Sequence, residues 1–320
     1  MEAQVYHIPV MLQPSVDGLN IKPSGVYVDV TLGGGSHSRE ILSRLGNEGR
    51  LFSFDQDEDA LSLAIAAGTQ GSEPDSRWTL VRSNFRYLKN WMRYYHVEAI
   101  DGLLADLGVS SHHFDDASRG FSFRTNAALD MRMNKRATQS AADVVNTYSR
   151  EQLASLFYVY GELRQARRIA DAIVKARSQK EIRTTDEMVD LLLPMLGHGG
   201  DRRTDGDVPT TAKKELAKAF QALRIEVNQE MEALREMLNA ATELLRPGGR
   251  LVVMSYHSLE DRMVKNLMRS GNVEGQVEQD IYGRVSSPLR PIGKPLTAST
   301  DEQTSNPRSR SAILRIAEKI

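Results

Sequence analysis

Short apolar runs alternate with stretches of helical spacing along the first part of the chain, and similar runs recur near its end. These runs are rich in β-branched and aromatic residues, which are common in buried strands. They cover residues 26–32, 51–55, 78–81, 100–107, 250–256 and 312–317. Between the early runs, residues 37–45, 58–67 and 85–95 place apolar side chains three or four positions apart, as one helix face requires. The alternation predicts an α/β fold with a mostly parallel sheet.

The strand pattern stops after residue 108 for roughly a hundred residues, which is longer than an ordinary crossover between strands. Helical spacing fills this interval at residues 140–146, 151–160, 164–177 and 185–196, before a polar, glycine-rich stretch at residues 197–207. We therefore predict a core in two parts, residues 1–110 and 213–320, interrupted by an inserted helical domain at residues 111–212.

The next stretch of the chain has the pattern of one long helix, from about residue 211 to residue 245. Pro247, Gly248 and Gly249 are expected to end this helix just before the strand at residues 250–256. Residues 271–310 are rich in Pro, Gly, Ser and Thr, so we expect them to lack regular structure until a final strand begins at Ser311.

A glycine turn at residues 33–35 follows the first predicted strand and opens a predicted helix. Asp55 ends the next strand about twenty residues later, where a carboxylate can bond ribose hydroxyls. Ser38 stands where a dinucleotide turn needs its third glycine, and the sequence contains no Gly-Lys-Ser/Thr P-loop. A phosphate-free nucleoside therefore fits better than a dinucleotide. Asp29 in the first strand suits a ligand with an ammonium group, such as S-adenosylmethionine; an ordinary tight turn is the alternative.

The charge balance is nearly even, with 41 Lys plus Arg against 42 Asp plus Glu, so any nucleic-acid binding must use local patches. The absence of cysteine excludes disulfides, thiolate metal sites and cysteine nucleophiles, and it agrees with a reducing cytosol. No apolar run is long enough to span a bilayer, and the first residues lack the features of a signal peptide. We therefore expect no membrane partner and a cytoplasmic location.

Polar clusters follow several of the predicted strands, at residues 33–38, 105–111 and 255–262, and another precedes the last strand at residues 306–311. In open α/β sheets, ligands bind at the carboxyl ends of the parallel strands. The first three clusters are therefore expected to meet at one edge of the sheet and to form one site there.

These clusters belong to a series of eight short sequence motifs, which are spread in one order over nearly the whole chain. They lie at residues 31–38, 54–57, 106–111, 119–123, 129–133, 220–225, 257–262 and 306–311. The series resembles the bacterial 16S ribosomal RNA cytosine-N4 methyltransferase family. The resemblance implies a class I, Rossmann-like methyltransferase that uses S-adenosylmethionine and carries a helical substrate-recognition insert. It also implies that the partner is 16S rRNA in the small ribosomal subunit, methylated at N4 of one cytidine in the decoding region.

Carried over by motif, the family's methyl-donor site falls on Gly35, Ser36, His37, Asp55, Phe85, Asp106 and His113. Ser36 stands where the family usually has a second consecutive glycine, and His112 and His113 replace a common Pro-Gln pair. Asp55 is expected to accept from the ribose hydroxyls, with a helix N-cap as the alternative. Phe85 is expected to stack on adenine or to pack in the core. Asp29 and His37 either contact the methionine part or hold the turn.

Transfer to N4 requires an acceptor for the proton of the amino group, because the nitrogen lone pair is delocalised into the cytosine ring. The chain lacks the Asp/Asn-Pro-Pro-aromatic motif of other amino-methylating enzymes. The first candidate is Asp106, helped by Ser110 or Ser111, although Asp106 is as well suited to bind only the cofactor. His257 is the second candidate, and its alternative is to cap the following helix.

A paired cytidine must be flipped out, or already be single-stranded, before its N4 can enter a pocket. Phe121, Phe123 and residues 131–133 are candidate stacking and apolar walls. The candidate phosphate contacts are Arg119, Arg124, Arg132, Lys135 and Arg136 in the insert, and Arg308 and Arg310 near the C-terminus. Arg164, Arg167 and Arg168 fit a solvated helix face better. We expect no metal, because His112 and His113 lack a further ligand at suitable spacing.

Two other classes of function are weighed against the methyltransferase. A non-catalytic ribosome-assembly or RNA-binding factor on the same fold is the main alternative, and a nicotinamide dehydrogenase is disfavoured by Ser38. Asp55 and Asp106 favour the enzyme. The sequence does not fix the oligomeric state and leaves a homodimer open.

Overall fold

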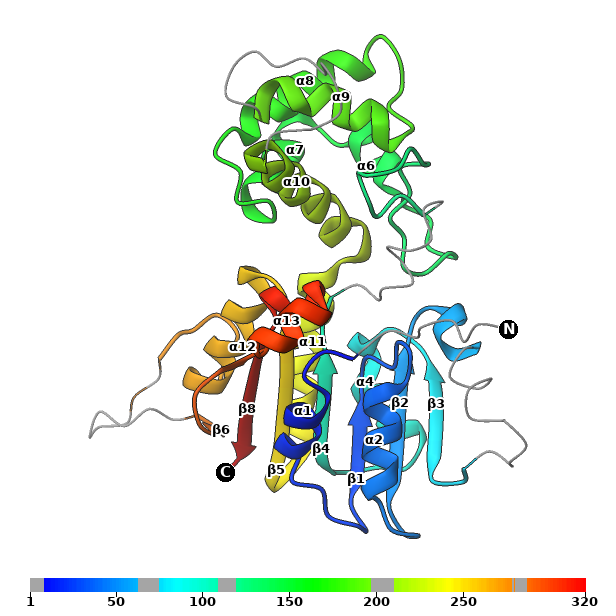
Figure 1. The fold of residues 1–320 in the computed structure, drawn as a ribbon, viewed down its shortest axis with the longest axis vertical. Coiled ribbons are helices and arrows are strands. Elements are labelled where there is room, and N and C mark those ends of the chain that lie inside the picture. Colours follow the sequence, from blue (N-terminus) through cyan, green and yellow to red (C-terminus); the bar gives the residue numbers. More distant parts are fainter. Residues whose placement is uncertain (1–8, 63–74, 109–118, 197–209, 278, 280–286) are drawn as a thin grey trace. The chain divides into compact units, whose positions relative to one another are not determined.

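The computed structural model describes residues 9–62, 75–108, 119–196, 210–277, 279 and 287–320 (Figure 1). The chain forms two compact units. The first comprises Met1–Gly108 and Met231–Ile320, and the second comprises Val109–Glu230.

The first unit is built on one sheet with the strand order β3-β2-β1-β4-β5-β8-β6. The parallel strands are β1 (Val26–Asp29), β2 (Arg50–Asp55), β3 (Trp78–Arg82), β4 (Ile100–Asp106) and β5 (Leu245–Ser255). Strand β8 (Ile313–Lys319) pairs antiparallel with β5, and both β6 (Leu289–Pro291) and β7 (Leu296–Thr297) pair antiparallel with β8. The predicted α/β fold with a mostly parallel sheet is confirmed. The strand order reverses between β1 and β4, which is where such sheets bind ligands.

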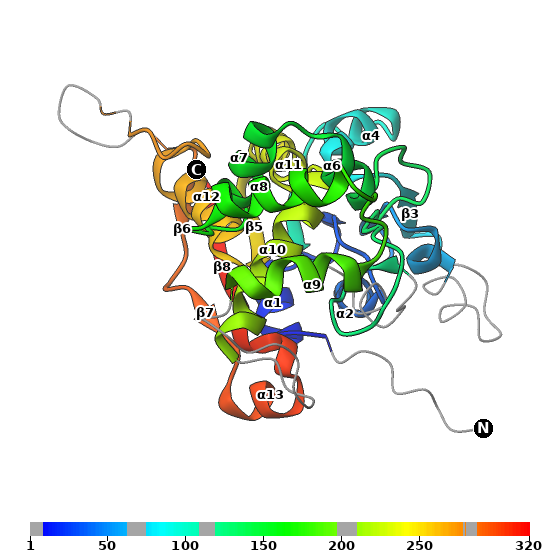
Figure 2. The same ribbon diagram turned by 90° about the horizontal axis from the view of Figure 1, so that it is seen from above.

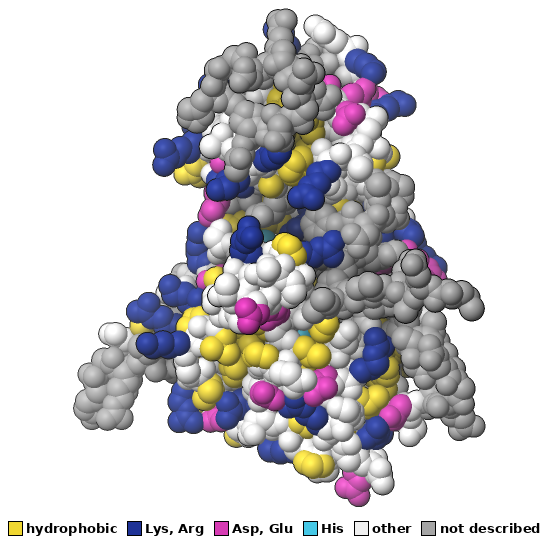
Figure 3. Space-filling model, viewed as in Figure 1, with side chains coloured by type: hydrophobic (Ala, Val, Ile, Leu, Met, Phe, Trp, Pro, Cys, Tyr) yellow, Lys and Arg dark blue, Asp and Glu magenta, His cyan; other side chains and the backbone are white. Residues whose placement is uncertain are grey.

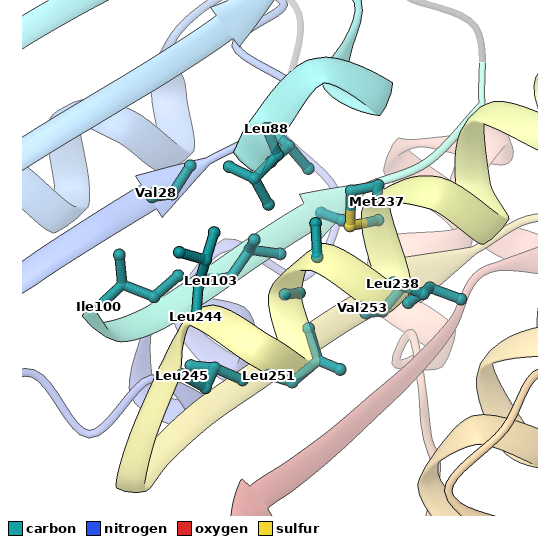
Figure 4. Packing of buried hydrophobic residues seen from close by; sticks show 14 of the residues in the cluster. Val28, Leu88, Ile100, Leu103, Met237, Leu238, Leu244, Leu245, Leu251 and Val253 are labelled. Carbon is teal, nitrogen blue, oxygen red and sulfur yellow. The ribbon is translucent and has the colours of Figure 1, made fainter. Parts of the chain in front are cut away.

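Helices cover both faces of this sheet (Figures 1 and 2). One face carries α1 (Leu12–Gly18) and α2 (Ser36–Arg44), and the other carries α4 (Leu88–Tyr94), α11 (Glu230–Leu244) and α12 (Ser258–Ser270). Successive strand residues point to opposite faces. Val28 and Leu103 therefore pack under α4 and α11 (Figure 4), whereas Tyr27 and Leu104 pack under α1 and α2. Burial on both faces explains why β1, β2, β4 and β5 carry apolar residues at successive positions.

The C-terminal stretch is more regular than its composition predicts. Residues 271–310 were expected to lack regular structure, but they contain β6, β7, α13 (Thr300–Ser305) and η3 (Pro307–Ser311). Main-chain pairing with β8 holds the two strands. The Ser299 side chain accepts the main-chain N–H of Glu302 and begins α13. These elements depend on caps and pairing, which apolar periodicity does not reveal.

The long helix predicted at residues 211–245 is two helices, α10 (Thr210–Asn228) and α11. Gln229 separates them in a left-handed conformation, with φ of 49°. Just before it, the Asn228 side chain donates to the Met131 carbonyl (2.8 Å) and accepts from the Met133 N–H (2.8 Å). The Asn228 side chain thus bonds the backbone of the neighbouring loop. The apolar pattern of the sequence does not show these hydrogen bonds and could not predict where the helix breaks.

The second unit is helical. It contains α6 (Ala141–Thr147), α7 (Arg150–Val159), α8 (Ala166–Arg177), α9 (Thr185–Leu196) and α10, packed around one apolar cluster. Ser140 and Ser149 form capping boxes at the starts of α6 and α7. The domain boundary predicted between residues 212 and 213 falls inside α10. Leu216, Phe220 and Leu223 of α10 are buried in this cluster, which places the helix in the second unit.

Within the described part of the chain, no helix has the length and apolar character that a membrane crossing requires.

Among the glycines that the structure describes in the second unit, Gly120 should be the least replaceable. Its φ is 71°, and a Cβ added there would lie 2.1 Å from the Ala128 carbonyl oxygen. We expect Gly120→Ala to lower the free energy of unfolding by about 2 kcal/mol or more, from backbone strain plus the clash. Gly248→Ala is the control, because Gly248 has φ of 77° but open space around an added Cβ. Urea denaturation of both variants measures the difference, and equal losses would contradict the role of the clash.

Candidate active site

The turn after β1 requires glycine at two positions. Gly33 has φ of 48°, and Gly35, the N-cap of α2, has φ of 74°; L side chains rarely adopt this region. The Gly35 N–H donates to the Leu32 carbonyl (2.7 Å) and closes the turn. Ser36 begins α2 and has no positive φ. Serine therefore replaces the family's usual glycine at position 36 without backbone strain.

Asp55 lies beside this turn, at the end of β2. Its Oδ2 accepts the Gly33 N–H (3.0 Å) and its Oδ1 accepts the Asp57 N–H (2.9 Å). The helix that starts at residue 58 is capped by another acid, because Asp57 Oδ1 accepts the Asp59 N–H (3.1 Å). The helix N-cap is therefore Asp57, and the capping alternative for Asp55 is not supported. The Asp55 carboxylate is held where the first glycine of the turn meets the end of β2.

Asp29 is fully buried beneath the turn. Its carboxylate accepts from Ser38 Oγ (2.6 Å) and from the Thr31 N–H (3.0 Å). Ser38 Oγ also contacts Ser53 Oγ (2.7 Å). Burial raises the pKa of Asp29, against the opposing effects of His37, Ser38 and Thr31. Of the two roles left open for Asp29, this geometry supports holding the turn.

Asp106, at the end of β4, is the centre of a second polar group. Its Oδ1 accepts from the Tyr256 hydroxyl (2.7 Å), and its Oδ2 lies 3.8 Å from His37 Nδ1. Its side chain is only 19% exposed. Burial raises the pKa of Asp106 to about 6; His37 and the Tyr256 hydrogen bond oppose this rise, while the charges of Asp29 and Glu260 add to it. Asp106 therefore changes its charge close to neutral pH.

His37 belongs to the same group. Its Nε2 lies 3.2 Å from the Val10 carbonyl oxygen, which can only accept, so Nε2 carries a proton. The side chain is buried at the start of α2, with Nδ1 toward Asp106. The position of His37 therefore links the glycine turn to the end of β4.

Tyr256 was missed in the sequence. It follows β5 directly, and burial and the adjacent Asp106 raise the pKa of its hydroxyl, which therefore stays protonated and donates. Gly108 follows β4 with φ of 100°, and a Cβ added there would lie 3.1 Å from the Tyr256 ring. A glycine after one strand and a tyrosine after the neighbouring strand were the available signal. Their contact depends on the pairing of β4 with β5.

His257 is half-buried at the N-cap of α12, where its side chain makes no capping hydrogen bond. Its Nε2 lies 3.2 Å from Glu260 Oε1, and Glu260 Oε2 accepts the Tyr256 N–H (2.9 Å). The capping alternative for His257 is therefore not supported.

The other predicted cofactor residues are less informative. Phe85 begins η1 (Phe85–Tyr87) and packs, partly buried, against the core under α4 and α11, so both of its predicted roles stay open. Ser110 and His113 lie outside the described residues.

Two of the predicted RNA contacts have structural partners instead. Arg119 is 7% exposed, and its guanidinium donates to the carbonyls of Arg132 (2.7 Å) and Met133 (2.9 Å). Arg132 donates from Nε and Nη2 to Asp130, each at 2.7 Å, and from Nη1 to the Ala137 carbonyl (2.6 Å). Partial burial favours the neutral acid, but the Arg132 hydrogen bonds hold the pKa of Asp130 below its usual range. These contacts do not support phosphate binding by Arg119 or Arg132.

Arg124, Arg308 and Arg310 are exposed. Arg308 and Arg310 lie on η3, which Asn306 begins by accepting the Arg308 N–H at 3.3 Å. The prediction that these arginines contact RNA stays a prediction.

A glycine turn beside an acid after β2, with a second acid after β4 at the reversal of the strand order, defines a Rossmann-like nucleoside-binding protein. The chain belongs to the MraW methylase family, whose sequence model matches residues 4–320. It is therefore a methyltransferase, and its sheet is the class I methyltransferase fold. This membership confirms the family resemblance drawn from the sequence.

Curated relatives match the chain over nearly its full length. A protein called ribosomal RNA small subunit methyltransferase H from Phocaeicola vulgatus is 60% identical over 317 residues, covering 99% of this chain and 98% of that protein. Proteins of the same name from Bacteroides thetaiotaomicron and Flavobacterium johnsoniae are 59% and 50% identical; each match covers 98% of this chain, and 97% and 98% of those proteins, respectively.

Proposed function

We propose that this protein methylates N4 of a cytidine in the decoding region of 16S rRNA. The names of its relatives support a small-subunit rRNA substrate. The observation that carries the chemistry is the carboxyl of Asp106, held by Tyr256 at the end of β4 with a pKa of about 6. The second unit is proposed to recognise the RNA, and the cytoplasm is the expected compartment.

The residues around the glycine turn fit a nucleoside cofactor. A Cβ added at Gly34 would meet nothing within 4 Å, so open space borders the turn. Asp55 lies beside that turn and offers carboxylate oxygens to ribose hydroxyls. Gly35, Ser36, His37, Phe85 and Asp106 would complete the site. S-adenosylmethionine, when bound there, supplies the methyl group as an electrophilic sulfonium.

The protein's own residues must hold the amino group and take its proton. The N4 lone pair is delocalised into the ring, which makes the nitrogen a poor nucleophile. Positive charge develops on nitrogen as it bonds the methyl group, and a nearby acceptor stabilises that charge. Asp106 is ionised above about pH 6 and can accept this N–H. The Tyr256 hydroxyl fixes one carboxylate oxygen and so orients the other. His257 is the second choice, because its Nε2 is directed to Glu260.

Methylation of purified small subunits and of free 16S rRNA, followed by mass-spectrometric mapping of the modified nucleoside, tests this function. We expect one N4-methylcytidine in the decoding region. A methyl group on another atom or nucleotide would refute the specificity. If calorimetry shows no binding of S-adenosylmethionine and no methylation occurs, the result would favour the alternative function, a non-catalytic ribosome-assembly factor.

Tyr256 makes the pH dependence a test of the Asp106 role. Methyl transfer should rise as pH increases through about 6, because only the ionised carboxylate accepts a proton. In Tyr256→Phe the carboxylate loses a hydrogen bond that favours its charged form, so the pKa of Asp106 should rise. The midpoint of the acid limb should move upward by about one pH unit. Tyr27→Phe is the control, because the Tyr27 hydroxyl bonds the Lys22 N–H instead (2.7 Å). Equal midpoints in both variants would contradict the assignment.

A further inference from the structure

The second unit contains a groove that combines an aromatic ring with cationic side chains. Phe123 and Arg124, which precede α6, and Lys213, Lys214 and Ala217 of α10 line a hollow of about 460 Å³. We call this the α10 groove. Its volume lies within the range of about 300–1,000 Å³ that is common for ligand sites. Lys and Arg side chains (dark blue) and apolar side chains (yellow) share the visible face of this unit in Figure 3.

The aromatic wall of the groove is anchored in the core of the second unit. The rings of Phe123 and Phe220 meet edge to face, with centroids 5.6 Å apart and an interplanar angle of 67°. Phe220 is 3% exposed, whereas Phe123 is only partly buried. The contact with Phe220 therefore holds the Phe123 ring, while the residue still lines the groove.

The cationic wall follows from the periodicity of α10. Lys213, Lys214 and Ala217 are three and four positions apart and share one exposed helix face. Leu216 and Phe220 lie on the adjoining face of α10 and are buried. Ala217, whose side chain is small, lines the hollow between these residues.

The charges of this groove favour an anionic ligand. Arg124 and Lys214 form no ion pair with other described residues, whereas Lys218, one turn further along α10, is paired with Glu215 at 2.9 Å. Cations beside an aromatic face are the combination by which proteins bind single-stranded nucleic acid: the cations contact phosphates, and the ring stacks on a base. A nucleic acid fits better than a simple anion, because its base can stack on the Phe123 ring while its phosphates contact the cations.

We propose that the α10 groove binds a single-stranded segment of the RNA substrate. Phe123 stacks on one base, and Arg124, Lys213 and Lys214 contact the neighbouring phosphates. This rests on the proposed function for the identity of the RNA. Lys213 and Lys214 were not among the phosphate contacts predicted from the sequence. They lie in the first turns of α10, next to the predicted domain boundary.

The test removes the two lysines and compares them with two other cations of the same unit. Lys213→Gln/Lys214→Gln removes the charges from the groove, and Arg167→Gln/Arg168→Gln removes the same charge from the exposed face of α8. Binding of a labelled single-stranded oligoribonucleotide is measured by fluorescence anisotropy at several salt concentrations. The lysine variant should bind about tenfold more weakly, and the slope of log affinity against log salt should fall by about 1.4. The arginine variant should keep both the wild-type affinity and slope.

Phe123→Leu tests the aromatic wall separately. It should weaken binding about tenfold and leave the salt slope unchanged, because stacking involves no counterion release. Circular dichroism of each variant checks that the helices persist. If Phe123→Leu does not fold, Phe123→Tyr is measured instead; it keeps an aromatic ring and should bind RNA with wild-type affinity. Wild-type affinity in both the lysine variant and Phe123→Leu would overturn the groove.

Methyl transfer to small subunits, measured in parallel, separates this inference from the proposed function. If wild-type protein binds RNA through the groove but transfers no methyl group to cytidine, the function fails and the groove stands. If wild-type protein methylates cytidine while the lysine variant and Phe123→Leu both bind RNA and react normally, the function stands and the groove fails.

Discussion

Replacing Asp106 with asparagine should slow methyl transfer by roughly 10²–10³-fold, within the range that general acid–base groups contribute. Asparagine keeps the shape of the side chain, and its oxygen can still accept from the Tyr256 hydroxyl. The amide cannot take a proton from N4 at neutral pH, whereas the carboxylate, with a pKa of about 6, can. Single-turnover rates with saturating RNA and S-adenosylmethionine measure the chemical step directly.

The same variant separates the two roles that the sequence left open for Asp106. If Asp106 only binds the cofactor, calorimetry of Asp106→Asn should show weakened affinity for S-adenosylmethionine, with a normal single-turnover rate at saturation. That outcome would contradict the acceptor role. His257→Gln is the matched comparison, because His257 was the second candidate acceptor. Its side chain is directed to Glu260, so we expect a loss of less than about tenfold.

The sheet could be predicted from the sequence because the inner parallel strands β2, β1, β4 and β5 are buried on both faces. Val28 and Tyr27, or Leu103 and Leu104, pack on opposite sides, so these strands carry apolar residues at successive positions. The break in the long helix could not be predicted, because it depends on Asn228 bonding a loop nearly a hundred residues away in the chain. The elements of the C-terminal stretch could not either, since their strands are held by pairing with β8.

The candidate site shows the same division. Asp55 and Asp106 could be placed at strand ends, because the carboxyl ends of parallel strands share one edge of the sheet. Tyr256 could not be predicted as a site residue, because its role depends on a hydrogen bond to Asp106 on the neighbouring strand. Arg119 and Arg132 were expected to face RNA by their charge alone. Their guanidinium groups are instead directed to carbonyls and to Asp130, a choice of partner that spacing cannot reveal.

Removing the Asp55 carboxylate should weaken the affinity for S-adenosylmethionine by roughly 100-fold. Two charge-assisted hydrogen bonds to the ribose hydroxyls, each about 1.5 kcal/mol, account for about 3 kcal/mol of binding free energy. Asp55→Ala also leaves the N–H groups of Gly33 and Asp57 without this acceptor, so a modest loss of stability should accompany the effect. Isothermal titration calorimetry gives the affinity, and turnover at saturating cofactor should recover to near the wild-type value.

Asp57→Ala is the control for this experiment, because it removes a carboxylate two residues away that caps the following helix. Its effect should fall on stability, with cofactor affinity changed by less than about threefold, since a lost cap costs about 1 kcal/mol of folding free energy. Equal affinities in Asp55→Ala and the wild type would remove the ribose assignment. Equal losses of affinity in the two aspartate variants would instead mean that both act through the shape of the turn. Only a loss confined to Asp55 supports direct contact, because both side chains bond the backbone of the same short segment.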